Sequence, residues 1–260
     1  MFDAAAVLDP LVARYASWHA LPGAATADTS DEDPDNVLLM PMVLRIERKD
    51  PPGRTALLEA AAAAALAVCL DERCKPGGEW HEPMHAWISG RIRKVSRRAR
   101  GAHWEAVQSL PGLTFEVGGA QVRAFLPARV ADMPKELTRL QISGSELEPD
   151  EPGPPAEDLP VLWLNPDVPM SAGKSAAQVG HATMIMAALL RAEGSEAELE
   201  KWAARGYRCS VRTADPDTWN RLHPRDDPET AWRERRVGMV RDAGFTEVDP
   251  GTVTVLAQWR

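Results

Sequence analysis

Residues 159–165 read LPVLWLN, residues 166–173 read PDVPMSAG, and residues 174–191 read KSAAQVGHATMIMAALLR. The first block is a short apolar run, which predicts a buried strand. The second is a loop rich in Pro and Gly, and the third has the apolar spacing of a helix. A strand that leads through a short loop into a helix is the unit from which α/β layer folds are built.

A similar unit occurs in the first half of the chain. The strand-like MPMVLRIER at 40–48 is followed by the loop KDPPG and by a predicted helix from Arg54 to about Leu70. On this alignment Gly53-Arg54 lies opposite Gly173-Lys174. Two further segments correspond, 90–95 with 206–211 and 134–140 with 250–256. We interpret the halves as copies that each read strand, helix, strand, helix, strand, strand; the alternative is chance similarity between two α/β domains.

The end of the chain predicts how each sheet closes. Thr252–Trp259 alternates apolar and polar residues, as a strand with one buried face does. This strand and the segment 237–242 are joined through Pro250-Gly251, so we expect a hairpin-like pair. The predicted fold class is α/β, with two domains of two or three layers. Each has a mixed, mostly parallel four-stranded sheet with flanking helices.

Charge divides the chain into four parts. The net charge of −8 comes from residues 1–36 and from residues 145–159, each at −6, whereas residues 37–144 carry +5 and residues 160–260 carry −1. Acidic stretches without apolar periodicity do not bury surface. We therefore expect a partly disordered acidic N-terminal segment, a basic domain at 37–144, an acidic Pro-rich linker, and a second domain at 160–260.

Composition excludes several classes of protein. With 44% hydrophobic and 26% charged residues the chain is globular. Three cysteines make no disulfide framework and no zinc pattern, and the N-terminus has no basic segment typical of a signal peptide. The apolar run 60–70 is too short to span a bilayer. We expect a cytoplasmic protein that needs neither metal nor cofactor and has no membrane partner.

The segment Gly173-Lys174-Ser175 follows a strand and opens a helix, as a phosphate-binding P-loop does. That motif needs a glycine where this chain has Val168. Pro166 and Pro169 also lack the N–H groups that would bind phosphates. A nucleoside triphosphate site is therefore not predicted.

Three polar residues of the same helix share one face, because Lys174, Gln178 and His181 are spaced i, i+4 and i+7. Small residues surround them and permit close packing. The pattern predicts a polar face at a cleft, with a solvated helix face as the alternative.

Two blocks together carry a resemblance to a known family. GKSAAQVGHA at 173–182 and RDAGFTEVDPGTVTVL at 241–256 resemble the two signature motifs of the archaeal and eukaryotic type of peptidyl-tRNA hydrolase, over about residues 159–259. The resemblance implies hydrolysis of the ester between a peptide and tRNA, which recycles peptidyl-tRNA. It implies a catalytic set made of Lys174, Gln178, His181, Asp242, Thr246 and Thr254, with His181 favoured as a supporting residue. A non-catalytic RNA-binding protein on this fold and a hydrolase of another acylated tRNA remain alternatives.

This chain departs from the family pattern at three places. Ala172 stands where the family often has a second lysine, the tail reads Ala257–Arg260 where the family has a Gly-Ile-Gly-Pro end, and residues 221–232 lengthen the region before the closing strands. The first half retains none of the helix residues. Arg54, Leu58, Ala61, Leu126 and Val130 replace the polar set, and Thr138 alone matches, opposite Thr254. Since single-domain members are commonly dimers, the resemblance implies a monomer in which this worn copy forms an intramolecular pseudo-dimer.

Basic residues are concentrated in the first half. The segment 90–104 contains Arg91, Arg93, Lys94, Arg97, Arg98 and Arg100, and a smaller cluster comprises Arg233, Arg235 and Arg236. Such clusters are typical of surfaces that bind nucleic acid phosphates, so both are predicted to contact tRNA. The alternative for the longer run is an edge strand that charge protects from aggregation.

Overall fold

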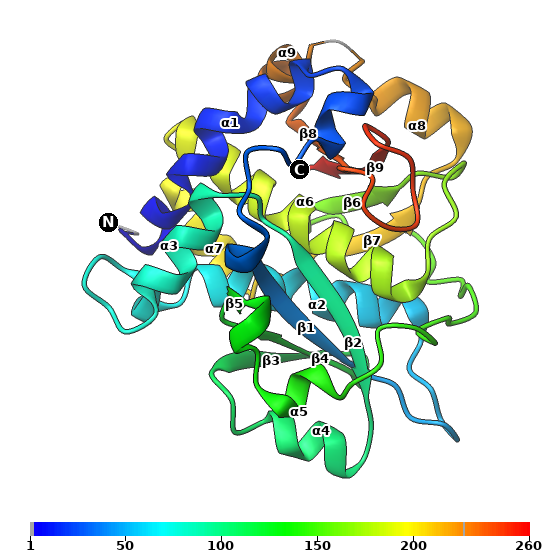
Figure 1. Cartoon of the computed structure of the whole chain (residues 1–260). Helices are drawn as coiled ribbons and strands as arrows, with labels where there is room; N and C mark the ends of the chain where they lie inside the picture. The colour runs from blue at the N-terminus through cyan, green and yellow to red at the C-terminus, as the bar shows by residue number, and fades with distance from the viewer. Residues whose placement is uncertain (1–2, 226) are drawn as a thin grey trace.

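The computed structural model describes residues 3–225 and 227–260 and contains two mixed β-sheets (Figure 1). The first sheet has the order β2-β1-β4-β3, with a short β5 paired to β1, and the second has the order β7-β6-β9-β8. The strands are β1 (Leu38–Arg45), β2 (Lys94–Ala99), β3 (Gly112–Val117), β4 (Ala120–Phe125), β5 (Ala128–Arg129), β6 (Val161–Leu164), β7 (Ser210–Thr213), β8 (Val237–Arg241) and β9 (Val253–Gln258).

Both sheets are more antiparallel than the sequence predicts. Only β1 with β2, and β6 with β7, run parallel; the other pairs are antiparallel. The α/β class and the mixed sheets are confirmed, but the expectation of mostly parallel strands was wrong. The reason is that each half ends in an antiparallel pair whose last strand inserts beside the first strand. In the first half the pair β3–β4 is closed by Gly118 and Gly119, both at positive φ, as a two-residue hairpin turn requires.

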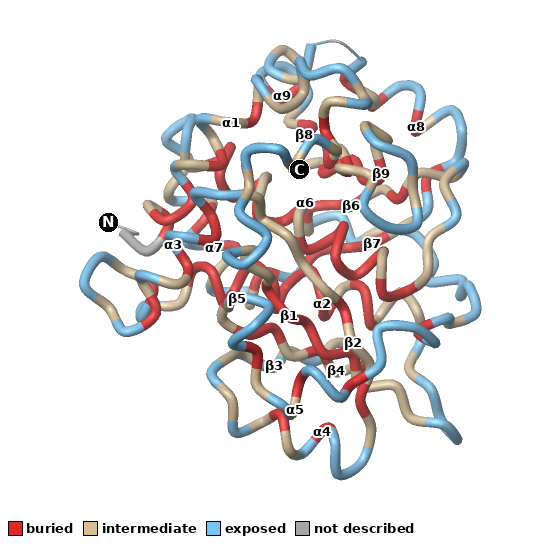
Figure 2. The backbone as a smooth tube through the Cα atoms, viewed as in Figure 1, coloured by how far each residue is buried: buried red, intermediate tan, exposed pale blue. Residues whose placement is uncertain are grey.

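Two central helices lie between the sheets. Helix α2 (Arg54–Cys69) covers the first sheet and α6 (Ala172–Ala192) covers the second, and the two make the most extensive contact between any described elements. Alanine side chains along α2 permit this close approach. A Cβ added at Gly180 of α6 would lie 2.8 Å from the Ala65 Cβ, and Thr183 Oγ1 donates to the Ala62 carbonyl at 2.9 Å. Figure 2 shows the buried residues concentrated where these helices and sheets meet.

The N-terminal segment is folded onto the second half. Its helix α1 (Asp9–Ala20) follows a 3-10 turn (Asp3–Leu8) and packs against α6. Trp18 Nε1 donates to the carbonyl of Arg241 at 3.1 Å, and the Met239 N–H donates to Tyr15 Oη at 3.0 Å. The sequence predicted a partly disordered acidic stretch here. The difference arises because Leu11 and Tyr15, each 7% exposed, bury an apolar face against the second half.

The two halves share one topology. In each, the first strand is central, the second runs parallel to it, and the fourth lies antiparallel on its other side. One proposed correspondence was wrong, because residues 135–138 form a short helix, α5 (Lys135–Thr138). The counterpart of β9 is β4: Val122 pairs with Leu44 where Val255 pairs with Leu164. Thr138 therefore does not take the place of Thr254.

The remaining elements lie at the outside. They are α3 (His81–Ser89), α4 (Ala102–Val107), α7 (Glu196–Ala204), α8 (Pro216–Leu222) and α9 (Pro228–Arg235). The segment 145–159 has no helix or strand and runs between the halves, where Asp150 accepts hydrogen bonds from Thr55 N and Ser145 Oγ accepts one from Gly173 N. No helix within the described ranges is long and apolar enough to cross a membrane.

Candidate active site

The polar face of α6 meets the end of β8. Ser171 caps the helix, its Oγ accepting from Lys174 N at 3.1 Å, and this places Lys174 and Gln178 one turn apart on the same face. Asp242 follows the last residue of β8. The chain turns sharply there at Gly244 (φ +84°), where a Cβ would lie within 2.6 Å of three atoms of Pro250. The turn aims the Asp242 carboxylate at the helix.

Five of the six residues implied by the resemblance form one hydrogen-bonded network. Lys174 Nζ lies 2.7 Å from Asp242 Oδ2 and 2.8 Å from Thr246 Oγ1. Gln178 Nε2 donates to the same Asp242 oxygen at 2.7 Å, and Thr254 Oγ1 donates to Gln178 Oε1. Thr254 and Gln178 are buried, whereas Thr246 is exposed. Thr254 therefore fixes the glutamine amide from the buried side of the network, and Thr246 lies on its exposed side.

The network leaves specific atoms free for a ligand. A carboxylate has about four lone-pair positions. Asp242 Oδ2 accepts two of the bonds above, and Oδ1 accepts one from Gly244 N at 2.8 Å, so Oδ1 retains a position for one more donor. An ammonium group carries three N–H donors. Lys174 uses two of them on Asp242 and Thr246, so one is left to point at a ligand.

His181 lies apart from this network and contacts a residue of the first half. Its Nδ1 is 3.0 Å from Lys94 Nζ, which also lies 3.0 Å from Met184 Sδ and 4.9 Å from the Trp87 ring. Burial, with Lys94 and Lys174 nearby, holds the pKa of His181 well below its usual range. Burial also lowers the pKa of Lys94 to about 7. A neutral imidazole and a readily deprotonated amine are thus paired at a half-buried position.

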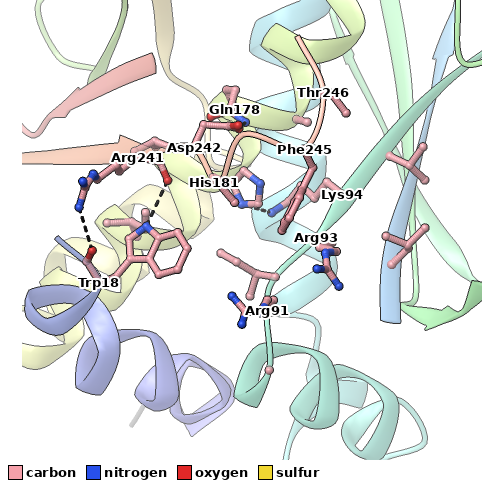
Figure 3. Close-up of a pocket in the computed structure, with 18 of the residues that line it drawn as sticks. Trp18, Arg91, Arg93, Lys94, Gln178, His181, Arg241, Asp242, Phe245 and Thr246 are labelled. Carbon is pink, nitrogen blue, oxygen red and sulfur yellow. Dashed lines mark hydrogen bonds between the residues drawn. The ribbon is translucent and has the colours of Figure 1, made fainter. Parts of the chain in front are cut away.

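Five of the six residues implied by the resemblance, all except the buried Thr254, line one large cavity between the halves (Figure 3). Its volume is about 900 Å³, and its walls come from α1, the segment leading into β2, α6 and the loop after β8. Figure 3 shows Phe245, Arg93, Lys94 and His181 gathered on one side, with Trp18 and Arg241 on the other. Since α6 and the loop after β8 supply only part of the wall, the first half and the N-terminal segment complete the cavity.

Of the long basic run, only its beginning reaches the cavity. Arg91 pairs with Asp31 at 2.5 Å and with Glu32 at 3.1 Å, and Arg93 pairs with Glu32 at 2.6 Å. Both arginines and both acids line the cavity mouth. Lys94, which follows them, points inward to His181 instead of outward to solvent.

The other predicted tRNA contacts lie elsewhere. Arg97 donates to the carbonyl of Leu140 at 2.8 Å, and Arg98 donates to that of Ser143 at 2.9 Å, so both tie β2 to the segment after α5. Arg100 is half-buried just after β2. The second cluster lies at the end of α9 and beyond the cavity lining: Arg233 bonds Thr230, Arg235 bonds the carbonyl of Arg221, and Arg236 pairs with Glu193 and Glu198.

Sequence reasoning did not find three features of the site. Trp18 of α1, the role of Lys94 beside His181, and the acids that pair with Arg91 and Arg93 depend on contacts between distant segments. One signal was present, since the acidic run at 31–35 has the opposite charge to the basic run at 91–100. Within the described residues, no group of three or more His, Cys, Asp or Glu side chains could hold a metal ion.

Comparison with known proteins identifies the family of the second half. The model of the family Peptidyl-tRNA hydrolase PTH2 matches residues 160–258. A curated protein named peptidyl-tRNA hydrolase, from Methanopyrus kandleri, is 41% identical over 98 residues, which cover 37% of this chain and 78% of that protein. No solved structure matches the chain. The family model matches the half that carries Lys174, Gln178 and Asp242, and the chain belongs to the PTH2 family of peptidyl-tRNA hydrolases.

Proposed function

We propose that the chain hydrolyses the ester between a peptide, or another N-blocked aminoacyl group, and the terminal ribose of tRNA, and so recycles peptidyl-tRNA as a carboxylic ester hydrolase. The observation that carries this proposal is the buried network of Lys174, Asp242 and Gln178, which opens into the cavity through Thr246. A protein that only bound RNA would not need this arrangement of acid, base and amide.

The free atoms of the network match the needs of ester hydrolysis. Asp242 Oδ1 can accept a proton or a hydrogen bond from the attacking water. The third N–H of Lys174 and the Thr246 hydroxyl can donate to the oxyanion that forms on the carbonyl. An activated ester needs little beyond such positioning. The hydroxyl of Ser171, a serine of the cavity lining that precedes the helix of Lys174, donates to Glu247 at 2.7 Å, so this serine is not paired with an imidazole or amine base that would activate it for covalent attack.

The tRNA backbone is proposed to contact the mouth of the cavity. Arg91 and Arg93 lie beside the catalytic residues, whereas Arg97 and Arg98 are engaged with backbone carbonyls. The double variant Arg91→Ala with Arg93→Ala should weaken tRNA binding and make the slope of log affinity against log salt shallower by about two units. The matched pair Arg97→Ala with Arg98→Ala should lower stability and leave the slope unchanged. A shallower slope for the Arg97 and Arg98 variant, with an unchanged slope for the Arg91 and Arg93 variant, would instead assign tRNA binding to β2.

The first half is proposed to act as an internal partner. Its helix α2 packs on α6, as a second subunit would, and it supplies Arg91, Arg93 and Lys94 to the cavity while lacking the catalytic set. We expect a monomer. Light scattering near twice 28.4 kDa would count against this pseudo-dimer.

Turnover with acylated tRNA tests the function directly. N-acetyl-aminoacyl-tRNA should be deacylated, and the same tRNA with a free amino group should be a poor substrate. Preference for the free aminoacyl form would support a hydrolase of another acylated tRNA. Tight tRNA binding without turnover of either substrate would favour a non-catalytic RNA-binding protein.

A further inference from the structure

Large apolar side chains that remain exposed gather at the cavity. Among the described residues four are strongly exposed, namely Leu21, Val130, Ile142 and Phe245, and all but Val130 line this one cavity. An exposed apolar cluster beside polar groups is typical of a binding site. Phe245 is the aromatic member, and its residue surface is 45% exposed.

The position of Phe245 relates it to the reacting ester. It lies in the turn between Asp242 and Thr246, which both bond Lys174. In the proposed substrate the ester is carried by the ribose of the terminal nucleoside. When the ester lies at the Lys174–Asp242 pair, the base attached to that ribose must therefore lie close to the same pair. The ring of Phe245 occupies such a position.

The first half prepares one face of this ring. The guanidinium carbon of Arg93 lies 4.6 Å from the centroid of Phe245, and Glu32 holds the same guanidinium at 2.6 Å. An arginine fixed over one face is a cation–π contact that orients the ring. The part of the Phe245 side chain that Arg93 does not cover borders the cavity. Arg93 also brings positive charge close to the phosphate that precedes the terminal nucleoside.

We propose that Phe245 and Arg93 form the subsite for the unpaired 3′-terminal base of the tRNA, with the base stacked on the Phe245 ring. Every nucleobase has a flat π-face, and stacking on an aromatic side chain needs no hydrogen-bond pattern. The platform combines one residue from each half, which gives the first half a direct part in substrate binding. The inference deepens the proposed function and rests on it.

Binding of a short oligonucleotide tests the subsite independently of hydrolysis. The probe is 5′-labelled CCA, compared by fluorescence anisotropy with the same trinucleotide carrying an abasic 3′ residue. The wild-type chain should bind CCA about tenfold more tightly than the abasic probe. Phe245→Leu, which keeps an apolar side chain but removes the π-face, should bind both probes equally. Phe245→Trp should restore the difference, and Val130→Ala, an exposed apolar residue away from the cavity, should behave as wild type.

Kinetics on N-acetyl-aminoacyl-tRNA supply the second readout. Phe245→Leu should raise KM about tenfold and leave kcat within about twofold, because the base is bound in the ground state and in the transition state alike. Failure of the wild type to bind CCA, or equal discrimination by Phe245→Leu, would overturn the subsite. If the increase in KM depended on which acyl group the tRNA carries, the subsite would also be overturned, and Phe245 would be assigned to binding of the peptide. If the wild type did not hydrolyse the substrate but still bound CCA more tightly than the abasic probe, the hydrolase function would be refuted and the base-binding subsite would be retained.

Discussion

Replacing Asp242 with Asn tests the chemistry of the site with the least change in shape. The amide keeps the size of the carboxylate but removes its charge and one acceptor oxygen. In the structure Asp242 Oδ2 accepts from Lys174 and Gln178, and both members of the ion pair are nearly buried, at 10% exposure for the lysine and 8% for the aspartate side chain. The variant therefore leaves a lysine charge that water reaches poorly, and it removes the acceptor for the attacking water.

Two magnitudes follow from this environment. Removing one partner of a buried ion pair costs roughly 3–5 kcal/mol of stability, and we expect a loss in this range because neither side chain is more than 10% exposed. Loss of a general base lowers the rate by roughly a hundredfold or more. We expect kcat to fall by at least about that factor, with little change in KM because the tRNA is held by other residues. Full loss of the carboxylate in Asp242→Ala should lower kcat at least as far.

Single-turnover hydrolysis of N-acetyl-aminoacyl-tRNA measures the rate, and urea unfolding measures the stability. Asp249→Asn is the matched control, because Asp249 is an exposed carboxylate in the same loop and should tolerate the change in both assays. A folded Asp242→Asn variant with undiminished kcat would remove Asp242 from the mechanism. The water would then have to be activated by another group.

Three other changes test the surroundings of the site. Lys94→Met removes an amine whose pKa is lowered to about 7. Between pH 7 and 10 the unfolded chain binds this proton and the folded chain does not, so wild-type stability should rise by up to about 1.4 kcal/mol per pH unit, and the variant should lack this rise. Equal dependence of urea unfolding on pH in both proteins would contradict the burial of this amine. Asp31→Asn with Glu32→Gln removes two negative charges at the cavity mouth that would repel tRNA phosphates, so filter binding should show tighter tRNA binding, and an unchanged affinity would mean that tRNA does not reach this mouth. Gly180→Val forces a Cβ to within 2.8 Å of the Ala65 Cβ and should cost about 1–3 kcal/mol in thermal unfolding; an unaffected midpoint would show that the two halves are not packed together in solution.

Local patterns predicted the elements that carry the proposed catalytic residues. The helix expected from Lys174 to about Arg191 is α6, and the closing strands expected at 237–242 and 252–259 are β8 and β9. Spacing i, i+4 placed Lys174 and Gln178 on one face because a helix repeats every 3.6 residues. Strand direction was not predictable in this way. Alternation reveals a buried face, but not the neighbour with which a strand pairs, and both sheets are accordingly more antiparallel than expected.

What the sequence determined by itself concerns the second half: its elements, its family, and the residues that meet at the helix start. These depend on short-range periodicity and on two contiguous motifs. Only the tertiary structure decided what surrounds them. The cavity is also lined by Lys94 and Arg93 of the first half and by Trp18 and Glu32 of the N-terminal segment. Charge counted along the chain assigned Lys94 and Arg97 to one basic surface, but the fold turns Lys94 toward His181 and binds Arg97 to the carbonyl of Leu140. Side-chain function in such a run depends on which face each residue presents and on what packs against it, and contacts between residues far apart in the chain settle both.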